Sequence, residues 1–320
     1  MPQVSVVIPT RDRPHQVRQA VAVATAQEDV DVEVLVVDDG SRIAAWEQVA
    51  ALEGGPVRVF RHETSRGVSA ARNTAIEHAT APWLAFLDDD DLWAPGKLSQ
   101  QLATAERTRA GFLHTGIVVV DEQLRVVGEY AAPEPNGLQA AMAEMNAIGT
   151  PSSVMSRTDL VREVGGFDER LSVLADWDLW LGIMQRTPVA SCPLPLTGYR
   201  EHRENMTITR LEEVRTELAY LAHKHDVYAA RNGGRFGGAP LEAWIAGSLR
   251  RSGHPWRAAR AYLGVGVRRG DGGAMVRGLL LLLGPGPMRA ARRARARRRL
   301  ADPAWLPPLR TPAEREGATG

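Results

Sequence analysis

Two kinds of segment alternate over the first hundred residues, and this alternation constrains the fold more than any other feature of the sequence. Short β-branched or apolar runs of strand length are bounded by Pro, Gly and Asp. They cover residues 4–8, 32–37, 57–60 and 83–87. Between them, residues 14–27 and 69–79 place small apolar side chains on one face of a helix. Alternating strands and helices predict right-handed crossovers and a mostly parallel sheet that is covered on both faces.

Polar clusters follow three of the four predicted strands. Residues 10–12 follow the first strand, residues 38–41 follow the second, and four consecutive aspartates, residues 88–91, follow the fourth. In sheets of this kind, ligands bind beyond the carboxyl ends of the strands, where the connecting loops collect. Three loops are therefore expected to bring carboxylates to one edge of the sheet.

The four consecutive aspartates need a cation, because adjacent like charges repel one another. Magnesium and manganese prefer oxygen ligands, and they are commonly held by one or two carboxylates together with phosphate oxygens of a substrate. The apolar run 82–87 precedes the aspartates, and Leu92 and Trp93 follow them, so burial on both sides should fix this turn. The sequence predicts a site for Mg²⁺ or Mn²⁺ that is completed by a nucleotide diphosphate.

The pattern changes along the rest of the chain. Residues 114–130 are typical of a β-hairpin, and residues 174–184 are typical of a helix with Trp180 facing inward. Helical patterns with Gly-rich breaks follow beyond residue 209. We predict a domain at 1–209 (nucleotide-binding half 1–112, acceptor half 113–209), a helical extension at 210–300 and a disordered tail at 301–320.

Composition excludes several kinds of protein. Thirty-nine basic residues nearly balance 38 acidic ones, so overall charge predicts no nucleic-acid binding. Cys192 is the single cysteine, which rules out an internal disulfide and a cysteine-based zinc site and favours a reducing compartment. Residues 4–9 are too short for a secretory leader, and the apolar run 274–284 is too short to span a membrane. We expect a cytoplasmic protein.

Six segments, in order and at the right spacing, resemble the family 2 glycosyltransferases of the GT-A fold over residues 3–208. They are 4-VSVVIPTRDRP-14, 34-VLVVDDGS-41, 67-GVSAARNTAI-76, 83-WLAFLDDDDLWAPGKL-98, 165-GGFDERL-171 and 176-DWDLWL-181. The resemblance implies an α/β fold with a mostly parallel mixed sheet. It also implies inverting transfer of a sugar from a nucleotide diphosphate sugar, UDP- or dTDP-linked, to an acceptor hydroxyl. Polysaccharide, glycolipid or natural-product glycoside synthesis would use such a reaction.

The resemblance also assigns the donor site. Asp39 matches the carboxylate that accepts a hydrogen bond from the nucleotide base, and Pro9, Thr10 and Asp12 would line the same pocket. Arg66 and Arg72 lie on either side of Gly67, and one of them is expected to meet the nucleotide or its phosphate.

The acidic run contains the DXD element of the family. Asp90 aligns with its metal ligand, and Asp88 and Asp89 would lie near the ribose and the metal. Asp91 is expected to cap the following helix. His202, in 199-YREHRENMT-207, matches a histidine that completes the metal site or contacts phosphate in relatives, the alternative being a surface histidine.

Asp176 is the candidate general base. Inverting transfer needs a group that takes the proton of the acceptor hydroxyl as it attacks the anomeric carbon. The family supplies this group from an acidic pair at the start of a helix, whereas this chain has Ala175 before Asp176. Asp178 is expected to be structural or to face the acceptor. A noncatalytic sugar-nucleotide-binding protein therefore stays open, as does a nucleotidyltransferase, although that class should carry a Gly-rich loop where this chain has 9-PTRDRP-14.

A basic cluster lies near the C-terminus. Seven arginines fall within residues 289–299, directly after five leucines at 279–283. Such a cluster beside an apolar patch favours contact of 279–299 with an anionic membrane surface, on the cytoplasmic side. A solvated basic helix or a self-association segment is the alternative. No aromatic residues are interleaved with the arginines, so we expect no nucleic-acid partner.

Overall fold

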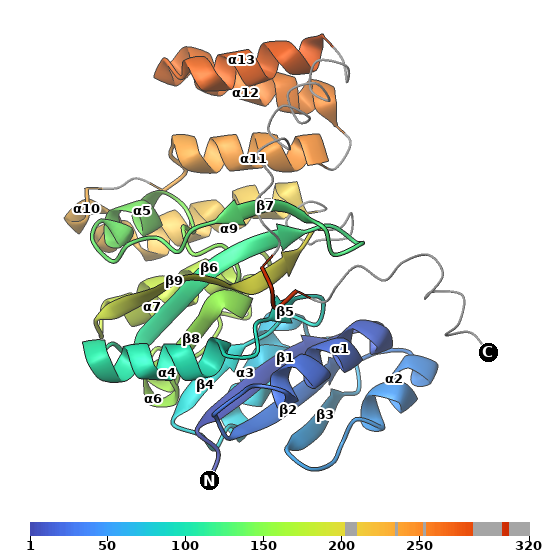
Figure 1. Ribbon diagram of the computed structural model, residues 1–320. Helices are drawn as coiled ribbons and strands as arrows, with labels where there is room; N and C mark the ends of the chain where they lie inside the picture. The colour runs from blue at the N-terminus through green and yellow to red at the C-terminus, as the bar shows by residue number, and fades with distance from the viewer. Residues whose placement is uncertain (202–209, 234–235, 252–253, 284–302, 307–320) are drawn as a thin grey trace.

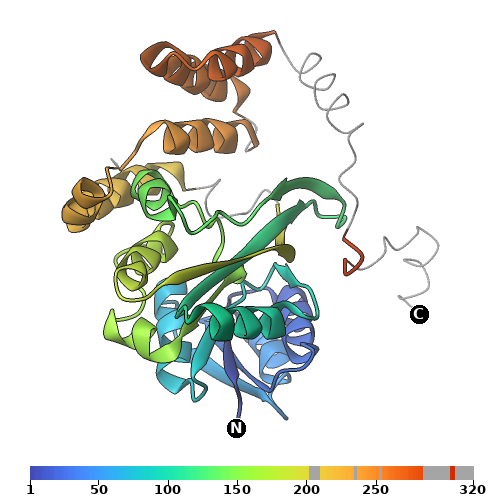
Figure 2. The ribbon, with the colours of Figure 1, turned by 60° about the vertical axis from the view of Figure 1, so that its left-hand side comes forward.

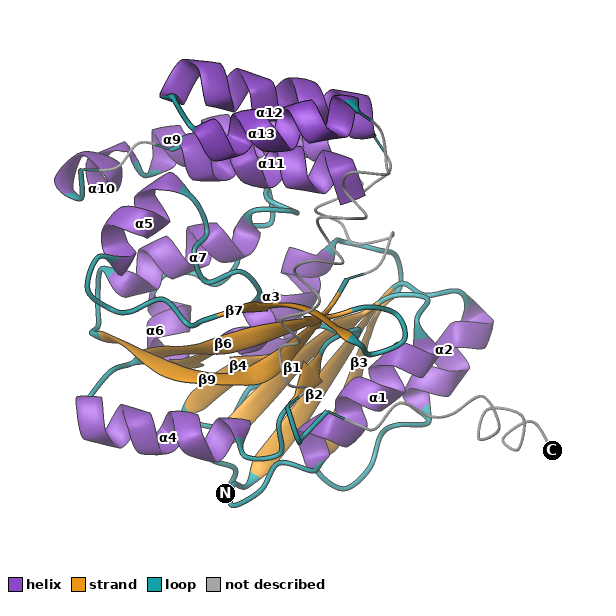
Figure 3. Cartoon of the chain, turned by 45° about the horizontal axis from the view of Figure 1, so that its top comes forward, coloured by secondary structure: helices purple, strands orange, loops and turns teal. Residues whose placement is uncertain are grey.

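The described residues of the computed structural model form a nine-stranded mixed sheet with helices on both faces (Figures 1 and 3). They comprise residues 1–201, 210–233, 236–251, 254–283 and 303–306. The strand order is β3-β2-β1-β4-β8-β6-β9-β5, with β7 paired to β6. The strands are β1 (Val4–Thr10), β2 (Val32–Asp39), β3 (Val57–His62), β4 (Trp83–Phe86), β5 (Leu92–Trp93), β6 (Phe112–Val120), β7 (Val126–Tyr130), β8 (Val154–Arg157) and β9 (Val189–Arg200).

Helices flank this sheet and continue beyond it. The helices of the first two hundred residues are α1 (Pro14–Thr25), α2 (Ile43–Ala50), α3 (Val68–His78), α4 (Lys97–Thr108), α5 (Leu138–Glu144), the 3-10 turn η1 (Pro151–Ser153), α6 (Thr158–Glu163) and α7 (Ala175–Met184). The later ones are α9 (Leu211–Lys224), α10 (Asp226–Arg231), α11 (Ala239–Arg251), α12 (Pro255–Arg269) and α13 (Gly272–Leu282).

The first four strands are parallel, as the alternating pattern predicts. β1 lies between β2 and β4, and every residue of β1 is buried because the sheet is covered on both faces. The register pairs Thr10 with Asp38. The carboxyl ends of β1 and β2 are therefore level, so the loops that follow them start side by side. The predicted hairpin is also confirmed, since β6 and β7 pair antiparallel around a turn at Asp121.

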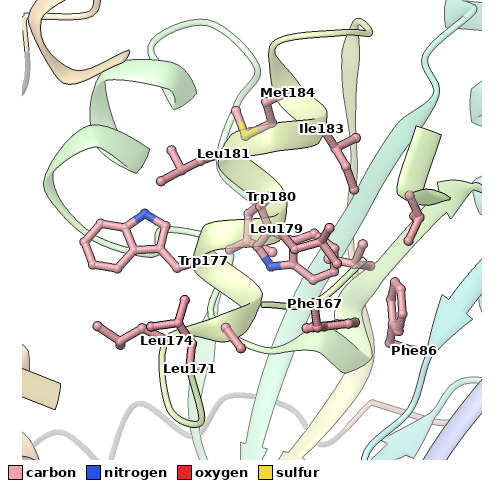
Figure 4. Close-up of a cluster of buried hydrophobic side chains, with 14 of the residues drawn as sticks. Phe86, Phe167, Leu171, Leu174, Trp177, Leu179, Trp180, Leu181, Ile183 and Met184 are labelled. Atoms are coloured by element: carbon pink, nitrogen blue, oxygen red, sulfur yellow. The ribbon is translucent and has the colours of Figure 1, made fainter. Parts of the chain in front are cut away.

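Two hydrophobic clusters lie on opposite faces of the sheet. One face is packed by α1, α2 and α4, and the other by α3, α5, α6 and α7. On the second face, helix α7 buries apolar side chains in two directions (Figure 4). Trp180 packs toward Phe86 and Phe167, with ring centroids 5.5 Å and 6.3 Å away, whereas Trp177 lies on the other side of the helix. Both indoles are fully buried, so α7 is held firmly against the sheet.

The hydrophobic core does not end at residue 209. Val214 and Leu221 of α9 are fully buried in the same cluster as α7, and Leu241 of α11 joins them. A separate apolar cluster begins within α11 and continues through α12 and α13, which stack away from the sheet (Figure 2). Helix α9 therefore packs as part of the domain that carries the sheet, and the predicted boundary at 209 divides one core.

The prediction of a disordered tail at 301–320 is wrong for residues 303–306. The indole Nε1 of Trp305 donates to the carbonyl of Pro195 at 3.0 Å. Leu306 is 8% exposed and packs with Leu92 and Val118. The side chains of Trp305 and Leu306 bury apolar area against the sheet. The prediction rested on the average composition of the segment, which is rich in proline and charged residues, and so gave no weight to these two residues. Across the described residues, no helix has the length and apolar character needed to cross a membrane.

Candidate active site

The loops after β1, β2 and β4 meet at one edge of the sheet, as predicted. The hydroxyl of Thr10 donates to Asp89 at 2.8 Å, which ties the end of β1 to the acidic loop. Asp12 has a positive φ of 54°, and its backbone N–H donates to the hydroxyl of Ser41 at 2.8 Å. Its carboxylate accepts from the backbone N–H of Arg42 at 2.9 Å. Pro9 lies within β1, one residue before this junction.

Asp39 anchors the loop that leads into α3. Its two carboxylate oxygens accept four hydrogen bonds, from the ring of His62, the hydroxyl of Ser65 and the backbone N–H groups of Arg66 and Gly67. Burial alone would raise the pKa of Asp39, but these donors hold it below its ordinary value. The acceptor capacity of Asp39 is thus taken up within the protein, and a nucleotide base would have to displace one of these donors.

The four aspartates divide into two kinds. Asp88 and Asp90 keep side-chain exposures of 28% and 16%, whereas Asp89 is 7% exposed and Asp91 is 2% exposed. Asp91 accepts from the hydroxyl of Thr150 at 3.2 Å and from the backbone N–H of Arg200 at 3.1 Å. The expectation that Asp91 caps the next helix is wrong, since α4 starts at Lys97 after Gly96, and that cap makes no side-chain hydrogen bond.

Among the described residues, Arg13 and Arg72 form ion pairs with the acidic loop. Arg13 lies 3.1 Å from Asp89 and 2.8 Å from Asp90, and Arg72 lies 2.5 Å from Asp88. Burial and the charge of Asp90 nevertheless raise the pKa of Asp89 to about 7. The same causes, with Asp88 added, raise the pKa of Asp91 well above its ordinary value. Asp89 and Asp91 are therefore held in surroundings that disfavour their negative charge, in spite of the two arginines.

The residues present fit a hard divalent cation. The donors of the acidic loop are all carboxylate oxygens, and the two solvent-facing members, Asp88 and Asp90, alternate with two buried ones. Among the described residues, no three His, Cys, Asp or Glu side chains form a group that could hold a metal ion unaided. His202, the other predicted ligand, lies outside the described residues.

Asp176 lies in the first turn of α7 and is buried. Its carboxylate accepts from the side-chain amide of Asn146 at 2.8 Å and from the backbone N–H of Trp177 at 2.7 Å. Burial raises the pKa of Asp176 to about 6; the positive charge of Arg72 lowers it, and the negative charge of Asp88 raises it. Asp176 is therefore electrostatically linked to the acidic loop through Arg72.

Asp178 has a different environment. It accepts from Lys224 at 2.8 Å and contacts the ring of His225 at 2.7 Å, both from the C-terminal part of the chain. Of the two roles predicted for Asp178, the contacts favour the structural one. Ala175, at the position of the missing acidic partner, is 1% exposed and packs in the core.

Sequence reasoning missed Arg13 and Asn146 as members of the site. Arg13 could have been found from its place directly after Asp12, in a loop that faces four carboxylates, because such an arrangement needs a balancing charge. Asn146 follows α5 in a loop with no regular pattern, so nothing in the sequence marks it. Of the two predicted arginines, Arg72 is buried beside Asp88, whereas Arg66 lies at the surface, 3.6 Å from Glu169.

Comparisons with known proteins point to a glycosyltransferase. Residues 5–147 match Glycosyl transferase family 2. The chain is 24% identical over 216 residues to the Escherichia coli protein WfgD, a UDP-Glc:alpha-D-GlcNAc-diphosphoundecaprenol beta-1,3-glucosyltransferase, covering 67% of this chain and 83% of WfgD. This match decides against the nucleotidyltransferase alternative.

Two solved structures share the fold. S. aureus TarS 1-349 in complex with UDP-GlcNAc superimposes with a TM-score of 0.57 at 17% identity, over 83% of this chain and 82% of the TarS 1-349 chain. The mannosyltransferase PcManGT from Pyrobaculum calidifontis, in complex with GDP-Man and Mn²⁺, gives 0.56 at 19% identity, over 92% and 84% of the two chains. The mostly parallel mixed sheet, the acidic loop at the strand ends, the family match over residues 5–147 and these two structures together support a family 2 glycosyltransferase with the GT-A fold.

Proposed function

We propose that the protein is an inverting, metal-dependent transferase that moves a sugar from a UDP- or dTDP-sugar to an acceptor hydroxyl. One observation carries the proposal. Arg72 pairs with Asp88 of the acidic loop and acts electrostatically on Asp176, so the candidate donor site and the candidate base share one charged side chain. The relatives support a nucleotide-sugar donor, since WfgD uses UDP-Glc and TarS binds UDP-GlcNAc.

Asp176 takes the proton of the acceptor hydroxyl. The hydroxyl oxygen attacks the anomeric carbon, the bond from that carbon to the diphosphate oxygen breaks, and its electron pair leaves with the nucleotide diphosphate. A pKa of about 6 leaves Asp176 mostly ionised near neutral pH and still close to the range in which a base is effective. Asn146 and the N–H of Trp177 orient the carboxylate, and each oxygen keeps acceptor capacity for the substrate proton.

Asp90 would hold Mg²⁺ or Mn²⁺, with Asp88 and Asp89 beside it and His202 as a further ligand. When bound, the ion would neutralise charge on the departing diphosphate. Arg13 and Arg72 add positive charge at the same edge of the sheet. Pro9, Thr10, Asp12 and Arg66 line the nucleotide side. We infer that Asp39 holds the loop 65–67 in place next to the nucleotide, because its carboxylate oxygens already accept hydrogen bonds from this loop.

The test compares two aspartates in the first turn of α7. Asp176→Asn should bind donor within about twofold of the wild type, yet transfer sugar roughly 10²- to 10⁴-fold more slowly, because only the proton acceptor is lost. Asp178→Asn is the matched control, since it loses the ion pair to Lys224 and alters the contact with the ring of His225, contacts that favour the structural role of Asp178 over the one facing the acceptor. Donor affinity is measured by calorimetry with Mn²⁺, and transfer with a panel of sugar nucleotides.

The pH profile adds an independent check. Transfer by the wild type should fall as pH drops through about 6, because Asp176 is then protonated. Wild-type turnover by Asp176→Asn would refute its role as base. Tight donor binding with no turnover for any sugar nucleotide would instead favour a noncatalytic binding protein.

We further propose a lipid-linked acceptor at an anionic membrane surface. WfgD acts on a diphosphoundecaprenol substrate. In this chain, residues 250–299 contain 14 arginines and one acidic residue. Helix α13 exposes apolar side chains at helical spacing: Met275, Val276, Leu279, Leu282 and Leu283 are 39–72% exposed. An apolar face within a basic segment suits a surface of anionic lipid. The predicted contact range 279–299 is described only to residue 283.

A further inference from the structure

Helix α9 presents a stripe of polar side chains to the segment that carries Asp176. Residues 213, 217, 220 and 224 recur at the spacing of one helical face, and each of them contacts residues 168–178. Tyr220 and Lys224 donate to Asp168 at 2.8 Å and 2.9 Å. The stripe links a helix that follows the predicted domain boundary to the helix of the candidate base.

Glu217 is the most buried member of this stripe, at 7% exposed. Its carboxylate accepts from three successive backbone N–H groups, those of Ser172 at 2.8 Å, Val173 at 3.0 Å and Leu174 at 2.8 Å. The hydroxyl of Ser172 donates to it as well, at 2.9 Å. Three consecutive amides that point at one carboxylate fix the backbone of this loop, since loss of the carboxylate would leave the buried amide of Leu174 and two part-buried amides without this partner.

These amides lie at the start of α7. Leu174 is the residue before the helix, and its side chain cannot cap it. The first N–H groups of a helix have no partner within the helix, so a carboxylate nearby is stabilising. Glu217 supplies that carboxylate from a helix more than forty residues later. Because Glu217 binds the amides before the helix, Asp176 accepts hydrogen bonds from other donors, the backbone N–H of Trp177 and the side-chain amide of Asn146.

We propose that Glu217 is a positioning residue for sugar transfer: by holding the three amides before α7, it fixes the first turn of that helix and with it the carboxylate of Asp176. The inference rests on Asp176 being the base. Because Glu217 lies behind the helix start and touches neither the acidic loop nor Arg72 among its described contacts, its loss should affect turnover and leave donor binding intact.

The experiment uses the full chain with Glu217→Ala and Glu217→Gln. Both should lower kcat by about 10- to 100-fold, as expected for a misplaced catalytic group, with the donor dissociation constant within about twofold. Glu213→Ala is the matched control, since Glu213 lies one turn earlier on the same stripe and meets only the hydroxyl of Ser172 in that loop. It should keep kcat within about threefold. Hydrogen exchange at residues 172–174 should accelerate in the Glu217 variants alone.

A double-mutant cycle separates this inference from the proposed function. If Glu217 acts through Asp176, then Glu217→Gln should lower transfer far less in an Asp176→Asn background than in the wild type. Equal effects in both backgrounds, an unchanged kcat in folded Glu217→Gln, or a matching loss of donor affinity would each overturn the inference. Full activity of Asp176→Asn alone would refute the base assignment, whatever Glu217 does.

Discussion

Lys97 is a fully buried lysine at the first position of α4, and replacing it should stabilise the protein. Its ammonium donates to Gln101 at 2.8 Å and lies 4.2 Å from the ring centroid of Trp93. These contacts do not compensate for burial, which lowers the pKa of Lys97 from 10.5 to about 7. The start of a helix is also an unfavourable place for a cation.

The magnitude follows from the linkage between protonation and folding. The pKa of Lys97 is about 7 in the folded protein and 10.5 in the unfolded chain. This difference corresponds to a free-energy cost of at most about 5 kcal/mol for keeping Lys97 charged in the folded protein. Lys97→Met keeps the length of the side chain and removes the charge, but it leaves Gln101 without a donor, which costs about 1–2 kcal/mol. We expect a net gain in unfolding free energy of about 1–3 kcal/mol at pH 7.

The sign of the pH dependence makes the test specific. Between pH 7 and 10.5 the unfolded chain binds a proton at Lys97 that the folded chain has released, so wild-type stability should rise with pH. The advantage of Lys97→Met should therefore shrink by about 2 kcal/mol from pH 7 to pH 9, measured as urea midpoints at each pH. Lys224→Met is the control: ion pairs to Asp168 and Asp178 raise the pKa of Lys224, so this substitution should destabilise the protein by an amount that stays constant from pH 7 to pH 9, where the folded and the unfolded chain both hold the proton. A gain independent of pH would refute the reasoning.

Two further predictions concern ligands. Arg13→Gln removes a cation from Asp89 and Asp90, so Mn²⁺ should bind the nucleotide-free protein roughly three- to fivefold more tightly in calorimetry, and unchanged or weaker binding would contradict this. The double substitution Leu279→Gln and Leu283→Gln should reduce flotation of the protein with phosphatidylglycerol vesicles by about tenfold. Val227→Gln, which changes an exposed side chain of α10, should leave flotation unchanged. Equal flotation of the wild type, the double variant and Val227→Gln would exclude α13 from the membrane contact.

The parallel strands, and the sheet edge at which the acidic loops meet, could be predicted from the sequence because both depend on local patterns. Strand-length apolar runs define β1, β2 and β4, and the carboxylates that follow them reach the same edge in any parallel arrangement. The predictions for Asp39, Asp88 and Asp176 rest on these patterns or on the family motifs that surround them. The sequence could not predict which groups each carboxylate contacts. The same residues around Asp39 would fit a carboxylate that accepts hydrogen bonds from a ligand and one that accepts them from the protein itself, as the structure shows.

The contacts that sequence reasoning missed join residues far apart in the chain. Glu217 lies on an ordinary amphipathic helix, and nothing near it indicates that its carboxylate faces the amides of residues 172–174. Trp305 lies in a Pro- and charge-rich segment whose average composition favours disorder, although one indole and its neighbour suffice to dock it. Such pairings depend on the tertiary arrangement, which no window of local periodicity contains.

The strand order also has a consequence for how the protein folds. The acidic loop lies between β4, which pairs with β1 and β8, and β5, whose partner among the described strands is β9, about a hundred residues later in the chain. Strands β1 to β4 can pair early in synthesis, but the second end of the acidic loop pairs with the sheet only after β9 has been synthesised and docked. On the ribosome, the four aspartates should therefore be among the last parts of the domain to become ordered, after the surrounding strands are already in place.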